Sequence, residues 1–346
     1  MTGVMNAVGL DRVRRQLREA VGADTIAALH RVNPGLDALA VLGSVALFAA
    51  NVWLLGMLAF GITWLALFVL QGFLLQWMGL VSHDLFVHRR AWGETGSWWA
   101  SLVLTLPRFS LPTGYEQAHL AHHRCLGTVQ DTEAYKQHLD TRARRCLFLT
   151  LAGIKLAQAG RLEAEAGLRA YHDVSGQGAL IERRARVEKW VMRGFLLTLL
   201  VLGMFFPRLA LLGFLLPVLV MGPVVNTLRI VIEHADVDPA NPWHGSTFYR
   251  TGPVSRLLFC WDSGDCHLVH HVFPRLPFYR MGRAVDLMRP HLLAQGVVER
   301  RSYAQLLKGW FVDAYPHRTL WPLADKAAAA KPGSPQPLSS LSNGQV

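Results

Sequence analysis

The stretch ALAVLGSVALFAANVWLLGMLAFGITWLALFVLQGFLLQWMGLVS, residues 38–82, contains no charged residue over 45 positions. One crossing of a bilayer takes about 20 apolar residues. The stretch is therefore long enough for two crossings and a tight turn, which we place at residues 56–61. A helical hairpin in a membrane is favoured over two helices buried in a soluble core, because uncharged runs of about 18 or more residues are typical of spanning segments.

A second apolar block covers residues 190–232 and is interrupted by Arg208, directly after Pro207. The 20 residues that follow, 209–228, are uncharged. We expect a second hairpin that turns at residues 207–208. The predicted fold is all-α and integral to the membrane, with four transmembrane helices in two hairpins. The spans are expected at about residues 38–57, 60–82, 190–207 and 209–231.

The charged residues orient this fold. Residues 1–37, the middle segment 81–189 and the C-terminal part are rich in Lys and Arg, whereas the two turns contain only Arg208. Cationic loops stay in the cytoplasm. We therefore expect cytoplasmic termini and a helical cytoplasmic cap made of residues 83–189 and 232–325. The net charge of +11 then suits contact with anionic lipid head groups. No nucleic-acid motif is visible, so the expected partner is the lipid bilayer and not nucleic acid.

The flanking segments carry weaker signals. Residues 1–37 are expected to form a cytoplasmic amphipathic segment, in which residues 10–32 suit either an interfacial helix or an ordinary cytosolic helix. Residues 38–325 would form the membrane domain. Residues 326–346, rich in Ala, Pro, Ser and Gly, are expected to be a disordered tail. The Arg- and Ala-rich composition suggests a bacterial source, and hence the bacterial inner membrane as the location.

Nine of the fifteen histidines fall into three clusters and one isolated position. The clusters are HDLFVH (83–88), HLAHH (119–123) and HLVHH (267–271), and the isolated residue is His234. His83 follows the second predicted span directly, and His234 follows the fourth. Both span ends are predicted at the cytoplasmic face, where the segments with the other clusters are also expected. All nine histidines can therefore meet at one interface.

The spacing of these histidines indicates metal binding. Successive residues of an α-helix turn by about 100°, so the three histidines of H-x-x-H-H spread over one helix face. In H-x-x-x-x-H about 140° separates the two rings, which suits ligation of different ions or a helix end that unwinds. Imidazole is a ligand of Zn, Cu, Fe and Ni. Because a structural zinc site uses only four ligands, nine histidines favour two ions of higher coordination number.

The three boxes, in this order around two hairpins, resemble those of the membrane fatty acid desaturases and related hydroxylases. The most specific part is GDCHLVHHVFPRLPFY (264–279), which is similar to that family's G-D-x-H-x-x-H-H-x-F-P-x-x-P-x-Y stretch. IEHADVD (232–238) looks like the family's isolated histidine, and Thr128, Asp131 and Glu133 match a T-x-x-D-x-E continuation. The resemblance covers roughly residues 38–290. The Arg89–Arg90 pair after the first box matches no pattern that assigns the chain to one subgroup of the family, and residues 134–189 match no named pattern.

This resemblance implies a non-haem di-iron centre of two iron ions, with O2 as co-substrate. The implied ligands are His83, His88, His119, His122, His123, His234, His267, His270 and His271. Ligand histidines usually donate their other N–H to a carboxylate or carbonyl. The carboxylates expected in that role are Asp84, Asp131 and Asp265, with Glu116 and Asp236 also nearby. Asp265 is equally suited to be the N-cap of a helix before His267, and Asp131 could lie in a solvated loop.

The expected function is desaturation of an acyl chain, in a fatty acyl lipid or an acyl carrier-linked substrate. A hydroxylase or ketolase of the same superfamily, acting on a lipid, a carotenoid or a specialised metabolite, is the alternative, because the same ligand set serves both reactions. No fused donor segment is visible, so electrons would come from a separate ferredoxin or cytochrome b5-type protein. A zinc-dependent membrane hydrolase and a metal carrier are rivals, although carriers place polar ligands within their spans.

Overall fold

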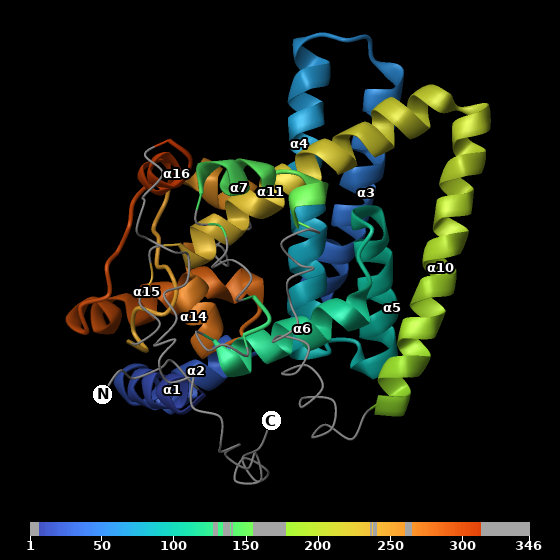
Figure 1. The fold of residues 1–346 in the computed structure, drawn as a ribbon. Helices are drawn as coiled ribbons and strands as arrows, with labels where there is room; N and C mark the ends of the chain where they lie inside the picture. The colour runs from blue at the N-terminus through green and yellow to red at the C-terminus, as the bar shows by residue number, and fades with distance from the viewer. Residues whose placement is uncertain are drawn as a thin grey trace, which may run out of the picture.

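The computed structural model describes residues 7–126, 131–133, 139, 141–154, 178–235, 237, 241–259 and 265–312. The regular elements within these ranges are all helices (Figure 1), which confirms the predicted all-α class. Three of the described helices are long and apolar enough to cross a membrane: Pro34–Met57, Ile62–Arg89 and Leu209–His234. The predicted disordered tail, residues 326–346, lies outside the described residues.

The first predicted hairpin is formed by α3 (Pro34–Met57) and α4 (Ile62–Ser82), which are joined by residues 58–61. The side chain of Asn33 caps α3 by accepting hydrogen bonds from the backbone of its first turn. Inside the hairpin, the Asn51 amide on α3 donates to the Gln71 side chain and to the Leu67 carbonyl oxygen, 3.0 Å away, both on α4. The amide side chains of the apolar run therefore join the two helices.

The third apolar helix begins as the π-helix η4 (Leu209–Leu215) and continues as α11 (Leu216–His234). It approaches the first hairpin closely, because a Cβ on Gly213 would lie 2.5 Å from the Val52 carbonyl oxygen. A Cβ on Gly72 would likewise lie 2.8 Å from the Met221 carbonyl oxygen. Small residues allow such approach between membrane helices. We call α3, α4, η4 and α11 the bundle.

The predicted span at residues 190–207 corresponds to the C-terminal part of α10 (Gly178–Phe205) and the two residues after it. Helix α10 is not one of the three described helices that are long and apolar enough to cross a membrane. The reason is the charge in its N-terminal and central parts, where Glu188, Lys189 and Arg193 lie. Figure 1 shows α10 standing beside the bundle and connected to η4. The Arg208 guanidinium, at this connection, donates to the Leu58 carbonyl of the first hairpin's turn.

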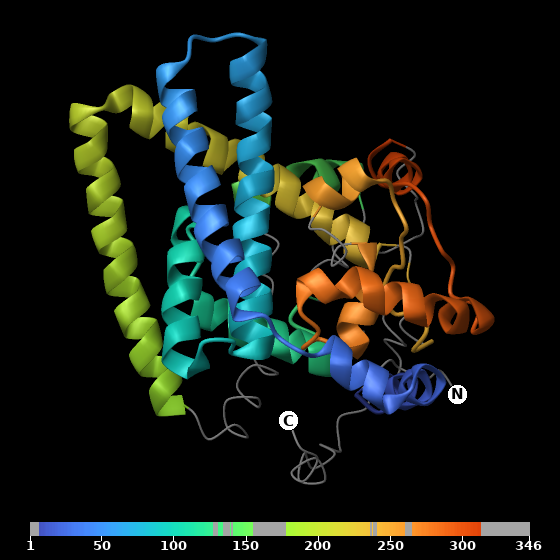
Figure 2. The ribbon, with the colours of Figure 1, turned by 180° about the vertical axis from the view of Figure 1, so that it is seen from behind.

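The other described helices pack around the opposite end of the bundle from the 58–61 turn, or on its flank (Figures 1 and 2). Their bounds are α1 Ala7–Val21, α2 Ala23–Leu29, α5 Gly93–Thr105, η2 Leu106–Arg108, α6 Pro112–Cys125, α7 Arg142–Leu147, α12 Pro253–Leu258, α14 His267–Val272, α15 Phe278–Ala294 and α16 Tyr303–Phe311.

The apolar face of α1 is used inside the protein. Leu10, Val13 and Leu17 are buried in one cluster with residues of α14 and α15. In addition, Arg14 Nε donates to the Val272 carbonyl at the end of α14, 2.8 Å away. Of the two alternatives for this segment, an ordinary packed helix therefore agrees with these contacts better than a helix whose apolar face lies in the membrane interface.

Candidate metal centre

The first histidine box lies where α4 widens into the π-helix η1 (His83–Arg89). A π-helix closes hydrogen bonds between residues five apart, so His83 and His88 lie on the same side of the chain. Their Nε2 atoms are 3.1 Å apart. The H-x-x-x-x-H spacing suited either ligation of different ions or a distorted helix end. The structure has the distorted helix end, and the two rings lie together.

The second box lies on α6, which begins with Pro112 in its first turn and crosses the lower end of α4 (Figure 1). Proline is favoured at this position because the first N–H groups of a helix have no partner within it. His119 Nε2 lies 2.8 Å from His83 Nε2 and 2.9 Å from His123 Nε2. His122 points from α6 toward His234 and His271, with ring centroids 5.1 Å apart in each case.

The third box occupies the short helix α14, beside the end of α11 that carries His234. His267 Nε2 lies 3.0 Å from His234 Nε2 and 3.2 Å from His271 Nε2. His270 turns the other way, toward the first box, and its ring centroid is 4.7 Å from that of His83.

The nine predicted histidines therefore meet in one place and divide into two adjoining groups. In the first group, five ligand atoms lie within 4.8 Å of one another, and its members are His83, His88, His119, His123 and His270. The second group consists of His122, His234, His267 and His271, linked by the contacts above. The groups touch through His123 and His271, whose ring centroids are 4.4 Å apart.

Burial sets the charge state of these rings. It lowers the pKa of His119, His123, His270 and His271 well below the usual value, and the neighbouring histidines lower it further. These four imidazoles are consequently neutral at pH 7. Neutral imidazole is the form that binds a metal ion.

The arrangement fits transition-metal ions. Two nitrogen ligands that each lie about 2.1 Å from one ion, at right angles, are about 3 Å apart, and the Nε2 pairs in both groups are spaced from 2.8 to 3.2 Å. His270 Nε2 is buried and has no hydrogen-bond partner among the described residues. Since a buried polar atom without a partner is costly, a metal ion between these nitrogens would satisfy the site.

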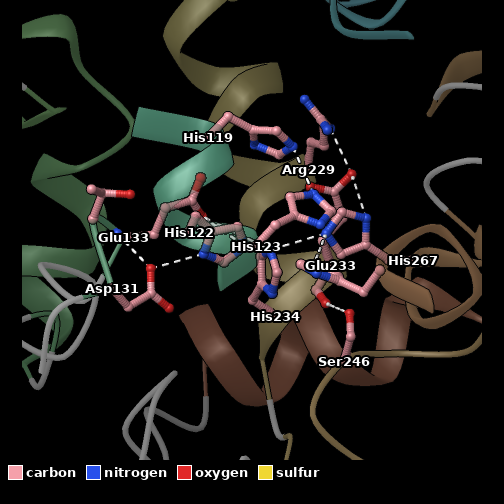
Figure 3. Close-up of polar contacts among 12 residues, drawn as sticks. His119, His122, His123, Asp131, Glu133, Arg229, Glu233, His234, Ser246 and His267 are labelled. Atoms are coloured by element: carbon pink, nitrogen blue, oxygen red, sulfur yellow. Dashed lines mark hydrogen bonds and ion pairs between the residues drawn. The ribbon is translucent and has the colours of Figure 1, made fainter. Parts of the chain in front are cut away.

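Of the three carboxylates expected to orient ligand histidines, Asp131 contacts one. His122 Nδ1 donates to Asp131 Oδ1 over 2.8 Å (Figure 3). Asp131 is fully buried, so the solvated-loop alternative does not apply to it.

The other two predicted carboxylates have different contacts. Asp84 pairs with Arg89 over 2.5 Å. Asp265 accepts hydrogen bonds from the Thr251 backbone and side chain, at 2.9 and 2.7 Å, and from the Tyr303 hydroxyl. The residue at the N-cap of α14 is Cys266 and not Asp265. Of the two other carboxylates, Glu116 pairs with Arg90, and Asp236 lies outside the described residues.

Two carboxylates near the histidines were given no role by the sequence. Glu233 Oε1 lies 3.6 Å from His267 Nδ1 and accepts a 2.6 Å hydrogen bond from Arg229 Nε (Figure 3). Glu133 Oε2 lies 3.9 Å from the Nε2 atoms of both His122 and His234. The signal for Glu233 was present as R-x-x-x-E-H at residues 229–234, since residues four apart share a helix face. For Glu133 it was the match to the T-x-x-D-x-E continuation.

The Asp131–His122 contact leads to a prediction. Asp131→Asn keeps the shape of the side chain but removes the negative charge that fixes the His122 tautomer. We expect metal affinity to fall about 10- to 100-fold, as is usual when such a partner is lost. Competition with a chelator of known affinity measures the change. Asp24→Asn, at an exposed position on α2, should bind as wild type, and an equal affinity in Asp131→Asn would show that this contact does not support a ligand.

Comparison with known proteins adds one finding. The profile of the family described as fatty acid desaturase matches residues 62–303, a range that contains all nine histidines. No curated protein matches the chain.

Proposed function

Because the chain belongs to the fatty acid desaturase family, we propose that it is an O2-dependent di-iron membrane oxidoreductase that introduces a C=C bond into an acyl chain. The observation that carries this proposal is the convergence of nine buried or half-buried histidines into two adjoining groups. Family membership supports an oxidoreductase that binds metal and works in a membrane. The choice of an acyl chain as substrate follows from the name of the family and from the apolar helices around the site.

We assign one iron ion to the first histidine group and the other to the second. When bound, the two ions would provide the redox chemistry that converts O2 into an oxidant able to take hydrogen from an unactivated C–H bond. In the balanced reaction, O2 takes up four electrons and four protons and becomes two molecules of water. Two of the electrons and two of the protons come from neighbouring CH2 groups, which become CH=CH. The external donor supplies the other two electrons, and the aqueous solvent supplies the other two protons.

The chain's own residues would prepare the site for this chemistry. Burial lowers the pKa of His119, His123, His270 and His271, which favours the neutral, metal-binding form of these rings. Asp131 orients His122, and Glu233 lies where it can orient His267. Arg229 pairs with Glu233 and adds a positive charge beside the histidines, which helps keep His270 unprotonated.

For the membrane arrangement we propose four spans, with α10 as the third along the chain. The apolar half of α10 is exposed, as its side chains Leu197, Leu200 and Met204 illustrate. The contact between Arg208 and Leu58 supports two hairpin turns at the same end of the bundle. In this arrangement the termini, the metal centre and the cap of residues 83–189 and 232–325 are cytoplasmic, and residues 38–325 form the membrane domain after the N-terminal segment 1–37.

We further propose that a separate ferredoxin or cytochrome b5-type protein delivers the electrons, at the inner membrane of a bacterium. Exposed arginines lie on elements that carry the histidines or pack against them: Arg124 directly follows His123, and Arg12 and Arg15 lie on α1, whose apolar face packs against α14. A basic surface of this kind attracts an acidic donor.

A hydroxylase or ketolase remains the second candidate, because its ligand set is the same. Mass spectrometry of lipids and metabolites, from cells that express the protein and from empty-vector cells, distinguishes the two reactions. The desaturase proposal predicts an acyl product that has lost two hydrogen atoms and gained a double bond. A product with an added oxygen and no new double bond would contradict it and support the second candidate.

A further inference from the structure

Glu188 is a fully buried carboxylate on α10, a helix that otherwise buries few of its side chains. Its Oε1 accepts a 2.7 Å hydrogen bond from Trp98 Nε1 on α5. The same oxygen accepts from the backbone N–H of Thr113, at 3.1 Å, and from the Thr113 hydroxyl. The carboxylate therefore joins three helices: α10, α5 and α6.

Thr113 is the second residue of α6, the helix that carries the second histidine box. The first N–H groups of a helix have no partner within it, and a negative charge at this end is favourable. Glu188 provides both a partner and a charge. His119 follows Thr113 by six residues, which is about 9 Å along a helix, so a displacement at Thr113 would be carried to the metal-binding nitrogens.

A second set of contacts holds α6 from the same direction. Glu116, one turn before His119, pairs with Arg90, which directly follows the first box. Arg90 also pairs with Glu94 on α5 over 3.2 Å, and Glu94 pairs with Arg184 on α10 over 2.6 Å. Arg184 and Glu188 are the buried residues of α10. The base of α10 is thus attached to both histidine-bearing elements through polar groups, beside the apolar packing of Val187 in the cluster that contains Phe86 and Val87.

We propose that Glu188 is a positioning residue for the metal centre: from α10 it fixes the N-terminus of α6, and through α6 the positions of His119, His122 and His123. The proposal rests on the proposed function, since it requires that these histidines bind metal. The first part of α10 lies in the segment 134–189, which matches no named pattern of the family. The proposal gives this part of α10 a role in holding the metal centre.

Cobalt binding tests this without depending on turnover. Purified wild type, Glu188→Ala, Glu188→Gln and Glu182→Ala are stripped of metal and titrated with Co(II), and the visible d–d absorption is recorded together with thermal unfolding. Glu182 is exposed on the same helix and is the matched control. The d–d bands report the geometry of the ligands, which a purely structural attachment of α10 would leave unchanged.

We expect Glu188→Ala to bind Co(II) about 10- to 100-fold more weakly, with shifted bands. Glu188→Gln keeps an oxygen that can accept from Thr113 and Trp98, so it should recover most of the affinity and the wild-type bands. Glu182→Ala should match wild type. Wild-type affinity and bands in Glu188→Ala, whatever its melting temperature, would overturn the inference.

If Glu188→Ala does not fold, Thr113→Val decides the question from the other side of the contact. The loss of the hydroxyl should weaken Co(II) binding several-fold and shift the bands, and unchanged binding would overturn the inference. If wild type itself binds neither Co(II) nor iron, the proposed function fails, and the inference fails with it. That result is distinct from normal binding by both wild type and the Glu188 variants.

Discussion

His270→Ala should bring product formation below detection while leaving the protein folded and inserted in the membrane. His270 belongs to the first histidine group, and its buried Nε2 has no hydrogen-bond partner among the described residues. Its ring centroid lies 4.9 Å from that of His88 and 5.0 Å from that of His123. Alanine removes one of the five ligand nitrogens of this group, so an ion bound there should be lost or weakly held.

Product formation in cells and the iron content of the purified variant measure this effect. The control is His291→Ala, because His291 lies on α15, is half-buried and belongs to neither histidine group. The control should retain wild-type activity and iron. Normal turnover in His270→Ala would remove this residue from the ligand set and would count against the division into two groups.

Arg89→Ala should lower the free energy of unfolding by about 3–5 kcal/mol, the largest stability effect that we predict. The substitution leaves two carboxylates buried without their partner. Arg89 lies between Asp37 on α3 and Asp84 on η1, at 2.7 and 2.5 Å. The Arg89, Asp37 and Asp84 side chains are 3, 2 and 6% exposed. Arg89→Lys should recover only part of the loss, since an ammonium group cannot form the same paired hydrogen bonds with two carboxylates.

Thermal unfolding in detergent measures this prediction, with Arg31→Ala as the control at an exposed position. A melting temperature of Arg89→Ala equal to that of the control would mean that the ion pairs contribute nothing to stability. Because Asp84 and Arg89 lie on either side of His88 in the chain, the unfolding experiment should be accompanied by iron analysis. We expect the variant to lose iron as well.

The first hairpin could be predicted from the sequence because a long uncharged run is typical of membrane-spanning helices. The turn predicted at 56–61 lies at 58–61 in the structure. A span in helix α10 was harder to predict, since charged residues such as Glu188 and Arg193 extend into the middle of the helix. Its packing against α5 and α6 depends on residues about 75 to 90 positions away in the chain. A local sequence pattern cannot indicate contacts between residues so far apart.

The histidine set could be predicted because spacing and order carry the information. The change to a π-helix at His83 could not, since a helical repeat does not reveal where a helix widens. Proximity in the sequence was also an unreliable guide to which carboxylates contact the histidines. Asp265, two residues before His267, contacts Thr251 and Tyr303, whereas Glu233 approaches His267 from another helix.

The departure at Arg89–Arg90 has a structural explanation. Arg89 binds the first box to α3, and Arg90 binds it to α5 and α6. The sequence presented two adjacent cations of identical type. Only the fold shows that they point to different helices and that together they fix the end of η1.

The central claim is that two iron ions lie in the two histidine groups. Its most direct test is elemental analysis of the purified protein, combined with measurement of O2 consumption in the presence of an electron donor. We predict two iron atoms per chain in wild type, a lower value in His270→Ala, and O2 uptake that follows the iron content. A protein that contains zinc alone, is fully active and consumes no O2 would contradict the claim.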